Sequence, residues 1–248
     1  MNPVEMIRFP NPGELAATAA ENWLNTLRGD SSGAPYHVAL SGGRITHAFF
    51  DSIVASCQRQ AAPLERVHFF WADERCVPAT DPESNFAVAQ RLLFRPLGIP
   101  ESRIHTIQGA IAPESAASQA VEDVRRTVPL NEMQQPVFDL VFLGMGEDGH
   151  VASLFPEESE EASGDGAIYR PVTASKSPPR RVTLGYAALA AARQVWVLAS
   201  GQGKEQALRN SLLESALTPL GRVLKMRKKT LILTDIPELD QERDLQAS

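Results

Sequence analysis

Short, almost continuously apolar runs recur along the 248-residue sequence and restrict the folds open to it. A strand that is apolar on both sides is typical of a parallel sheet covered on both faces. One further run, at residues 180–187, alternates more and is another strand candidate. The five apolar runs lie at residues 36–42, 66–73, 138–146, 193–201 and 230–235.

Helical patterns separate these runs. Asn11 can cap a helix in which Pro12 takes the first position and Glu14 reaches back to the cap. Strands that alternate with helices predict a three-layer α/β/α sandwich with a mostly parallel central sheet. No shift in composition divides the chain, so we expect a single α/β domain over residues 1–248. The predicted helical stripes are Leu15, Ala19, Trp23, Leu27; Phe49, Phe50, Ile53, Val54, Cys57; Ala117, Val121, Val124, Val128; and Ala207, Leu208, Leu212.

The formal net charge of -6 bears on possible partners. A chain of this sign has no general attraction for nucleic acid or an anionic membrane, so neither is expected as a partner. An acidic small molecule would need a local cationic pocket. Cys57 and Cys76 are not paired in a metal-binding spacing, so we expect free thiols, no metal and no cofactor. The N-terminus lacks the apolar core of a signal peptide, and a cytoplasmic location is expected.

Four stretches lie at the ends of predicted strands, and ligands bind at the carboxyl ends of parallel strands. In LSGGRIT (40–46), Gly42 and Gly43 would let the backbone approach an anion at the start of a helix. The same two glycines also fit an ordinary tight turn. In WADERCVPATDPESNF (71–86), Arg75 could bind a phosphate or carboxylate, and Asp73 could orient Arg75 or handle protons. An ion pair before a loop is the simpler interpretation.

The third stretch, GMGEDGHVASLFP (144–156), contains a histidine among glycines. His150 could be a general base, because its ordinary pKa is close to neutral, and Asp148 or Glu147 could hold its tautomer. A turn histidine bound to backbone is the alternative. The fourth stretch, ASKSPPRRVTL (174–184), brings together Lys176, Arg180 and Arg181. They could form a phosphate pocket or a basic surface loop.

Taken together, these stretches resemble the 6-phosphogluconolactonase family. The resemblance runs in order from about residue 10 to about residue 215, and GMGEDGHVASLFP fits the family pattern at every specified position. The region after Pro219 matches poorly. The remaining matches are Ser41-Gly42-Gly43, DERCVP (73–78) with Ser84-Asn85, then Lys176, Pro178-Pro179, Arg181 and Thr183, and GQGK ending in Lys204.

The resemblance implies a fold shared with glucosamine-6-phosphate deaminases and ribose-5-phosphate isomerases. It implies hydrolysis of 6-phospho-D-glucono-1,5-lactone to 6-phosphogluconate in the oxidative pentose phosphate route. A δ-lactone is an activated ester, so this reaction requires no metal. His150 is then the base, and Arg75, Lys176 and Arg181 are phosphate contacts. We add that Asp148 would hold the imidazole and that the Gly42-Gly43 backbone could stabilise the oxyanion.

Some residues depart from the family pattern. The family usually continues SGG with Ser-Thr-Pro, whereas this chain has Arg44-Ile45-Thr46, and Arg44 could add a phosphate contact or face solvent. Two other functions stay open. One is a glucosamine-6-phosphate deaminase-like isomerase, although Ala-Ser-Leu-Phe at 152–155 favours the lactonase. The other is a sugar-phosphate-binding protein without catalysis.

For the association state, the sequence predicts a monomer or a small homo-oligomer and does not decide between them. The acidic stretch 157–166 is a predicted loop that could border the site or be a solvated excursion, and the final ERDLQAS is a predicted frayed end.

Overall fold

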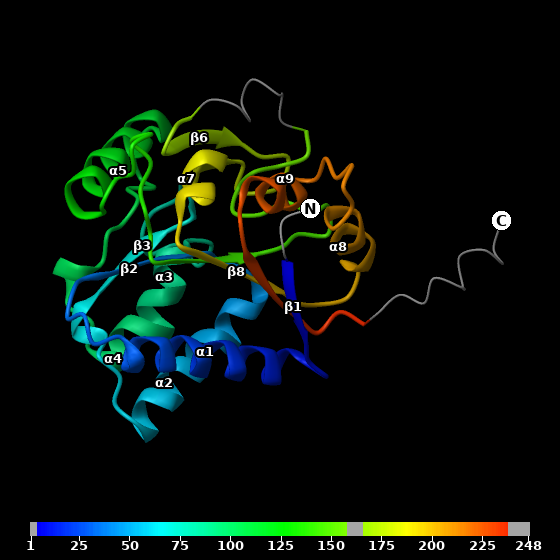
Figure 1. The fold of residues 1–248 in the computed structure, drawn as a ribbon. Helices are drawn as coiled ribbons and strands as arrows, with labels where there is room; N and C mark the ends of the chain where they lie inside the picture. Colours follow the sequence, from blue (N-terminus) through cyan, green and yellow to red (C-terminus); the bar gives the residue numbers. More distant parts are fainter. Residues whose placement is uncertain (1–3, 158–165, 238–248) are drawn as a thin grey trace.

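A computed structural model describes residues 4–157 and 166–237 (Figure 1). Its central sheet has six strands in the order β1-β9-β8-β5-β2-β3, and all neighbouring strands are parallel. All five apolar runs become strands of this sheet, as predicted. The sixth strand, β1, is half-buried at the sheet edge, where the apolar signal is weak. The strands are β1 (Val4–Arg8), β2 (Tyr36–Leu40), β3 (Val67–Trp71), β5 (Leu140–Gly144), β8 (Gln194–Ala199) and β9 (Thr230–Thr234).

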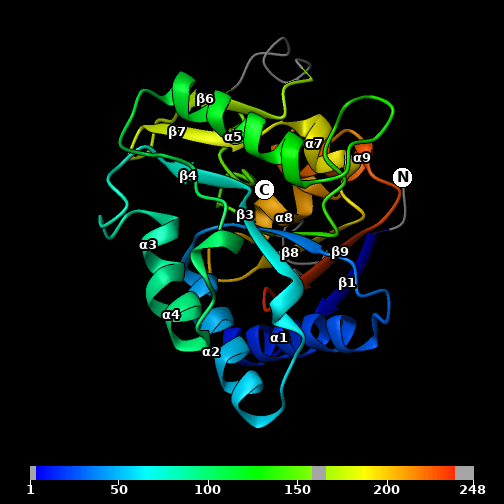
Figure 2. The ribbon, with the colours of Figure 1, turned by 90° about the vertical axis from the view of Figure 1, so that its left-hand side faces the viewer.

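Helices cover both faces of the central sheet. The helices α1 (Pro12–Gly29) and α2 (Arg44–Arg59) lie on one side, whereas α5 (Pro113–Thr127), α7 (Tyr186–Ala191) and α9 (Pro219–Met226) lie on the other (Figures 1 and 2). This arrangement confirms the predicted α/β/α layering. The shorter helical elements are Leu64–Arg66, α3 (Asn85–Ala89), a π-helical turn at Gln90–Phe94, α4 (Arg95–Leu97), Glu101–Arg103 and α8 (Glu205–Ser211).

The α1 helix forms as its sequence predicts. The Asn11 side chain accepts a hydrogen bond from the Glu14 backbone N–H at 2.9 Å and donates one to Glu14 Oε1 at 2.9 Å. Its apolar stripe is completely buried, from Leu15 to Leu27. Each large apolar side chain buried in this way stabilises the fold by about 1.5–3 kcal/mol. In α2 the stripe is buried through Ile53, whereas Val54 and Cys57 are half-buried.

A second, antiparallel sheet of order β4-β7-β6 lies on the same side as α5 and α7 (Figure 2). It consists of β4 (Asp73–Arg75), β7 (Arg180–Leu184) and β6 (Tyr169–Thr173). The run at 180–187 is therefore a strand, but of this sheet. Ala72 joins the sheets: its N–H donates to Leu40 O at 2.7 Å, and its carbonyl accepts from Leu184 N at 2.7 Å. The junction carries Asp73 and Arg75 beyond the carboxyl end of β3.

Two sequence-based expectations fall largely on undescribed residues. The predicted loop at 157–166 includes residues 158–165, and the final ERDLQAS belongs to residues 238–248; both ranges lie outside the described residues. Within residues 4–157 and 166–237, none of the helices is long and apolar enough to cross a membrane.

Candidate active site

A cavity opens at the carboxyl ends of β2, β5 and β8, where five separate stretches of sequence meet. Six of the eight predicted site residues line it, while Asp148 and Lys176 lie outside its lining. Its lining residues are Ser41, Gly42, Gly43, Arg44, Ile45, Asp73, Arg75, Gly144, Met145, His150, Ala152, Arg181, Leu198 and Lys204.

The Gly42-Gly43 turn forms one wall of this cavity and leads into α2. Gly43 has a φ of 114°, a conformation that favours glycine, and it is the N-cap of the helix. A Cβ on Gly42 would lie 1.9 Å from Asn85 Oδ1, so this position needs glycine as well. The first N–H groups of a helix lack intrahelical partners and favour an anion. The turn thus brings a preformed anion-binding backbone to the cavity.

His150 forms a close pair with Asp148. Its Nδ1 lies 2.5 Å from Asp148 Oδ1, which leaves Nε2 as the ring nitrogen available to a substrate or water. Burial lowers the pKa of His150, while Asp148 opposes that shift. The imidazole is therefore neutral and able to accept a proton at pH 7.

Lys176 forms an ion pair with the second carboxylate oxygen of Asp148. Its Nζ donates to Asp148 Oδ2 at 2.9 Å. Burial would raise the pKa of Asp148, but the hydrogen bonds from Lys176 and His150 outweigh it and hold that pKa far below its ordinary value. Asp148 is therefore an anion held between two nitrogen donors. This contact accounts for the position of Lys176 outside the cavity lining.

Two glycines shape the loop that carries His150. A Cβ on Gly146 would lie 2.0 Å from His150 Nδ1 and 2.6 Å from Asp148 Oδ1, so the imidazole packs directly on the backbone. Gly149 has a φ of 78°. Its carbonyl accepts from Leu220 N in the first turn of α9 at 3.0 Å. The far C-terminal part of the described chain therefore holds the histidine loop in place.

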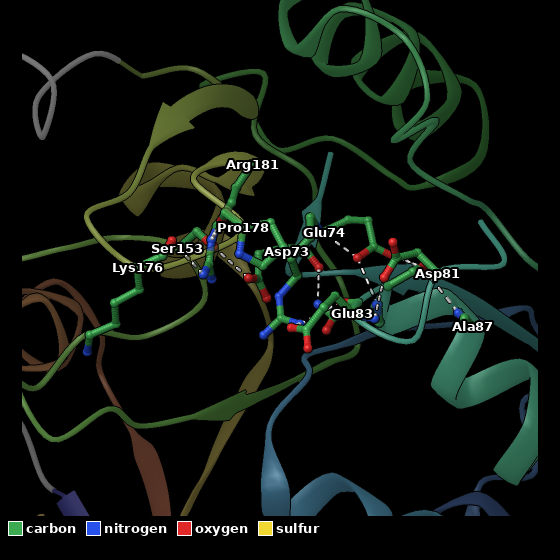
Figure 3. A network of polar contacts seen from close by, with 12 residues as sticks. Asp73, Glu74, Asp81, Glu83, Ala87, Ser153, Lys176, Pro178 and Arg181 are labelled. Carbon is green, nitrogen blue, oxygen red and sulfur yellow. Dashed lines mark hydrogen bonds and ion pairs between the residues drawn. The ribbon is translucent and has the colours of Figure 1, made fainter. Parts of the chain in front are cut away.

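Asp73 belongs to a buried polar network (Figure 3). Ser153, which is fully buried, donates from Oγ to Asp73 Oδ2 at 2.7 Å. Arg181 Nη1 lies 3.5 Å from the same Ser153 Oγ, and the guanidinium lies 5.6 Å from the centre of the Phe155 ring. Sequence reasoning missed Ser153; a serine between Ala152 and Leu154 in an otherwise apolar stretch was the available signal. The network fixes one Asp73 oxygen and the Arg181 side chain.

The two neighbours of Asp73 in β4 have different functions. Glu74 is buried and accepts hydrogen bonds from Ser84 Oγ and from the backbone N–H groups of Asn85 and Phe86 at the start of α3 (Figure 3). Glu74 therefore connects β4 to the start of α3. Arg75 lines the cavity, and its Nη1 donates to Glu83 O at 2.6 Å.

Two further cations line the cavity beyond the eight predicted site residues: Arg44, for which the sequence left a phosphate contact or a solvent-facing position open, and Lys204. Lys204 precedes α8 at the end of the GQGK turn, and Arg44 is the first residue of α2. Burial lowers the pKa of Lys204, and Arg44 adds to that shift through charge repulsion. By contrast, Arg180 is exposed and absent from the lining, so the three cations of residues 174–184 do not gather at one place. Among the described residues, no three His, Cys, Asp or Glu side chains are grouped to hold a metal ion.

A neutral histidine paired with an aspartate, among cationic side chains at the carboxyl end of a parallel sheet, is typical of an α/β enzyme site for a small anionic substrate. The chain belongs to the family described as glucosamine-6-phosphate isomerases/6-phosphogluconolactonase, whose model matches residues 10–232. The resemblance identified from the motifs is thereby confirmed.

Individual relatives agree with this assignment. The chain is 34% identical to the 6-phosphogluconolactonase of Streptomyces coelicolor, over 80% of this chain and 79% of that protein. It is 36% identical to the 6-phosphogluconolactonase of Mycobacterium tuberculosis, over 81% and 82% of the two chains. The crystal structure of the 6-phosphogluconolactonase from Thermotoga maritima superposes with a TM-score of 0.77 at 26% identity, covering 93% of this chain and 98% of that one.

Proposed function

We propose that this protein hydrolyses 6-phospho-D-glucono-1,5-lactone to 6-phospho-D-gluconate. The observation that carries the proposal is the His150–Asp148 pair, with 2.5 Å between Nδ1 and Oδ1, placed at a cavity with four cationic side chains. Relatives named 6-phosphogluconolactonase, which align over about four fifths of the chain, support the choice of substrate.

The reaction requires one water and one proton acceptor. A lactone is an activated ester, so water can attack its C1 carbonyl once a base removes a proton. His150 Nε2 accepts that proton, and Asp148 stabilises the resulting imidazolium. When the bond between C1 and the ring oxygen breaks, His150 returns the proton to the leaving oxygen. The free acid is the only product, and His150 is neutral again.

The Gly42-Gly43 turn stabilises the charge that develops on the carbonyl oxygen. Backbone N–H groups fixed at the start of α2 need no reorganisation during the reaction, which makes such donors effective. Asp73 has one oxygen bound by Ser153. The other oxygen is available to accept hydrogen bonds from sugar hydroxyls.

Cationic side chains bind the phosphate group and orient the ring. Arg75, Arg181 and Lys204 line the cavity together with the α2 N-terminus, and arginine matches phosphate geometry through its planar fork. We assign Lys176 to Asp148 instead of to the phosphate, because its ammonium lies 2.9 Å from the Asp148 carboxylate. We also propose a cytoplasmic enzyme, which suits the two free cysteines.

The direct test is hydrolysis of freshly prepared 6-phosphogluconolactone, followed at constant pH and corrected for spontaneous opening. The proposal requires saturable acceleration by the wild-type protein. Ammonia release from glucosamine 6-phosphate would favour the deaminase-like alternative. Binding of 6-phosphogluconate without acceleration of lactone opening would favour a binding protein, and either result would refute the lactonase.

A further inference from the structure

Arg44 occupies an electrostatically unfavourable position at the mouth of the cavity. It is the first residue of α2, whose first turn contains no acidic residue, and a cation there opposes the helix dipole. Lys204 lines the same cavity and lies close enough for Arg44 to lower its pKa further, beyond the effect of burial. The α2 N-terminus, Arg44 and Lys204 thus bring positive potential together, and the carboxylates that favour the charged form of Lys204 are Glu147 and Asp235, both outside the cavity lining.

Glu147 is the carboxylate that pairs with Arg44. Its Oε1 lies 3.8 Å from Arg44 Nη2, and the two side chains are 63% and 85% exposed. A long, exposed pair of this kind contributes little stability and separates easily. Glu147 also favours the charged form of Lys204. It belongs to the loop that carries Asp148 and His150, so a ligand that replaces it would act beside the catalytic pair.

A buried hydroxyl gives a second, independent sign of a missing ligand. Ser41 is only 7% exposed and lines the same cavity, and its Oγ has no hydrogen-bond partner among the described residues. A buried polar atom normally has a partner. An oxygen-rich anion at the start of α2 would supply one, and it would also neutralise Arg44 and Lys204.

We propose that Arg44 is a specificity-determining contact for the substrate phosphate and that Glu147 is its intramolecular competitor. The inference rests on the proposed function in taking the anion to be the phosphate of the substrate. Arg44 adds a full charge where the family pattern has a serine, which offers one neutral hydrogen bond. Glu147 holds the guanidinium in the free enzyme, gives way to phosphate, and returns when the phosphorylated product leaves.

The main test compares Arg44→Ser and Arg44→Lys with the wild type on two substrates, 6-phosphogluconolactone and unphosphorylated glucono-1,5-lactone. Arg44→Ser should raise KM for the phosphorylated lactone by about 5- to 30-fold. This is the effect expected from the loss of one hydrogen bond to a charged group, reduced because the Arg44 side chain is exposed. Its kcat and its activity on the unphosphorylated lactone should change little, and Arg44→Lys should be intermediate. Arg59→Ser is the matched control, since it removes the same charge from the exposed far end of α2.

Glu147→Gln tests the competition. It should lower KM for the phosphorylated lactone, and the improvement should shrink in the Arg44→Ser background, because coupled residues are not additive. Inorganic phosphate provides a probe that needs no catalysis: it should raise the melting temperature of the wild type and of Glu147→Gln more than that of Arg44→Ser. This arm tests the inference even if the wild type shows no lactonase activity. The inference would be overturned if phosphate raised the melting temperatures of Arg44→Ser and Arg59→Ser equally. It would also be overturned if Glu147→Gln bound phosphate more weakly than the wild type.

Discussion

Gly146→Ala is a single-methyl change directed at His150 and Asp148, the proposed catalytic pair. The new Cβ would lie 2.0 Å from His150 Nδ1, 2.1 Å from Cε1 and 2.6 Å from Asp148 Oδ1. Carbon contacts are favourable near 3.5–4.0 Å, so the imidazole must retreat by roughly 1 Å or more. The ring cannot do so freely, because Asp148 holds Nδ1 at 2.5 Å and the Phe155 ring centre lies 4.9 Å away.

Misplacement of a catalytic group by about 1 Å can reduce the rate by roughly 10²-fold. We therefore expect Gly146→Ala to lose about that factor in kcat on 6-phosphogluconolactone, with KM nearly unchanged because the cations are untouched. The backbone of Gly146 lies outside the left-handed region, so alanine adds no conformational strain of that kind. Gly29→Ala at the end of α1, where a Cβ meets no atom within 4 Å, is the control. A folded Gly146→Ala enzyme with normal kcat would refute the assignment of His150 as base.

Three further expectations concern His150, Lys176 and Arg227. The pH profile of kcat/KM should have its acid limb below pH ~6.5, because burial lowers the pKa of His150 from that ordinary value. Lys176→Met should move that limb to higher pH, since loss of the cation favours protonation of Asp148 and His150; an unmoved limb with a raised KM would instead make Lys176 a phosphate contact. Arg227, which is buried, donates to Leu189 O at 2.6 Å and to Ala192 O at 2.9 Å, and burial lowers its pKa to about 10. Arg227→Met should lower the free energy of unfolding by about 2–4 kcal/mol in urea titrations, and unchanged stability would contradict a role in holding the end of α7.

The central sheet could be predicted because its strands are apolar on both sides. The strands that the sequence analysis did not predict, β1, β4 and β6, lack a continuous apolar run. The edge strand β1 is only half-buried, and β6 contains Pro171. The β4 strand consists of Asp73, Glu74 and Arg75, whose charges suggested a loop. Its pairing with β7 arises from chain segments about a hundred residues apart, and the pattern of one segment does not reveal such a partner.

Much of the site was also predictable, for a topological reason. Parallel strands deliver the residues that follow them to one edge of the sheet, so Gly42, Arg75 and His150 meet although they are distant in sequence. Local sequence could not show that Lys176 lies against Asp148 instead of in the cavity. That contact depends on the path by which residues 174–179 return past the histidine loop. Lys204 was visible as the end of a glycine turn, but only the fold places it beside Arg44.

The most direct test of the account is the rate of lactone opening by His150→Asn, measured at constant pH with fresh 6-phosphogluconolactone. Asparagine keeps a similar shape but cannot accept and return the proton. The account expects kcat to fall by about 10²- to 10⁴-fold while the protein stays folded and still binds inorganic phosphate. A His150→Asn variant that opens the lactone as fast as the wild type would contradict the central claim that His150 is the general base.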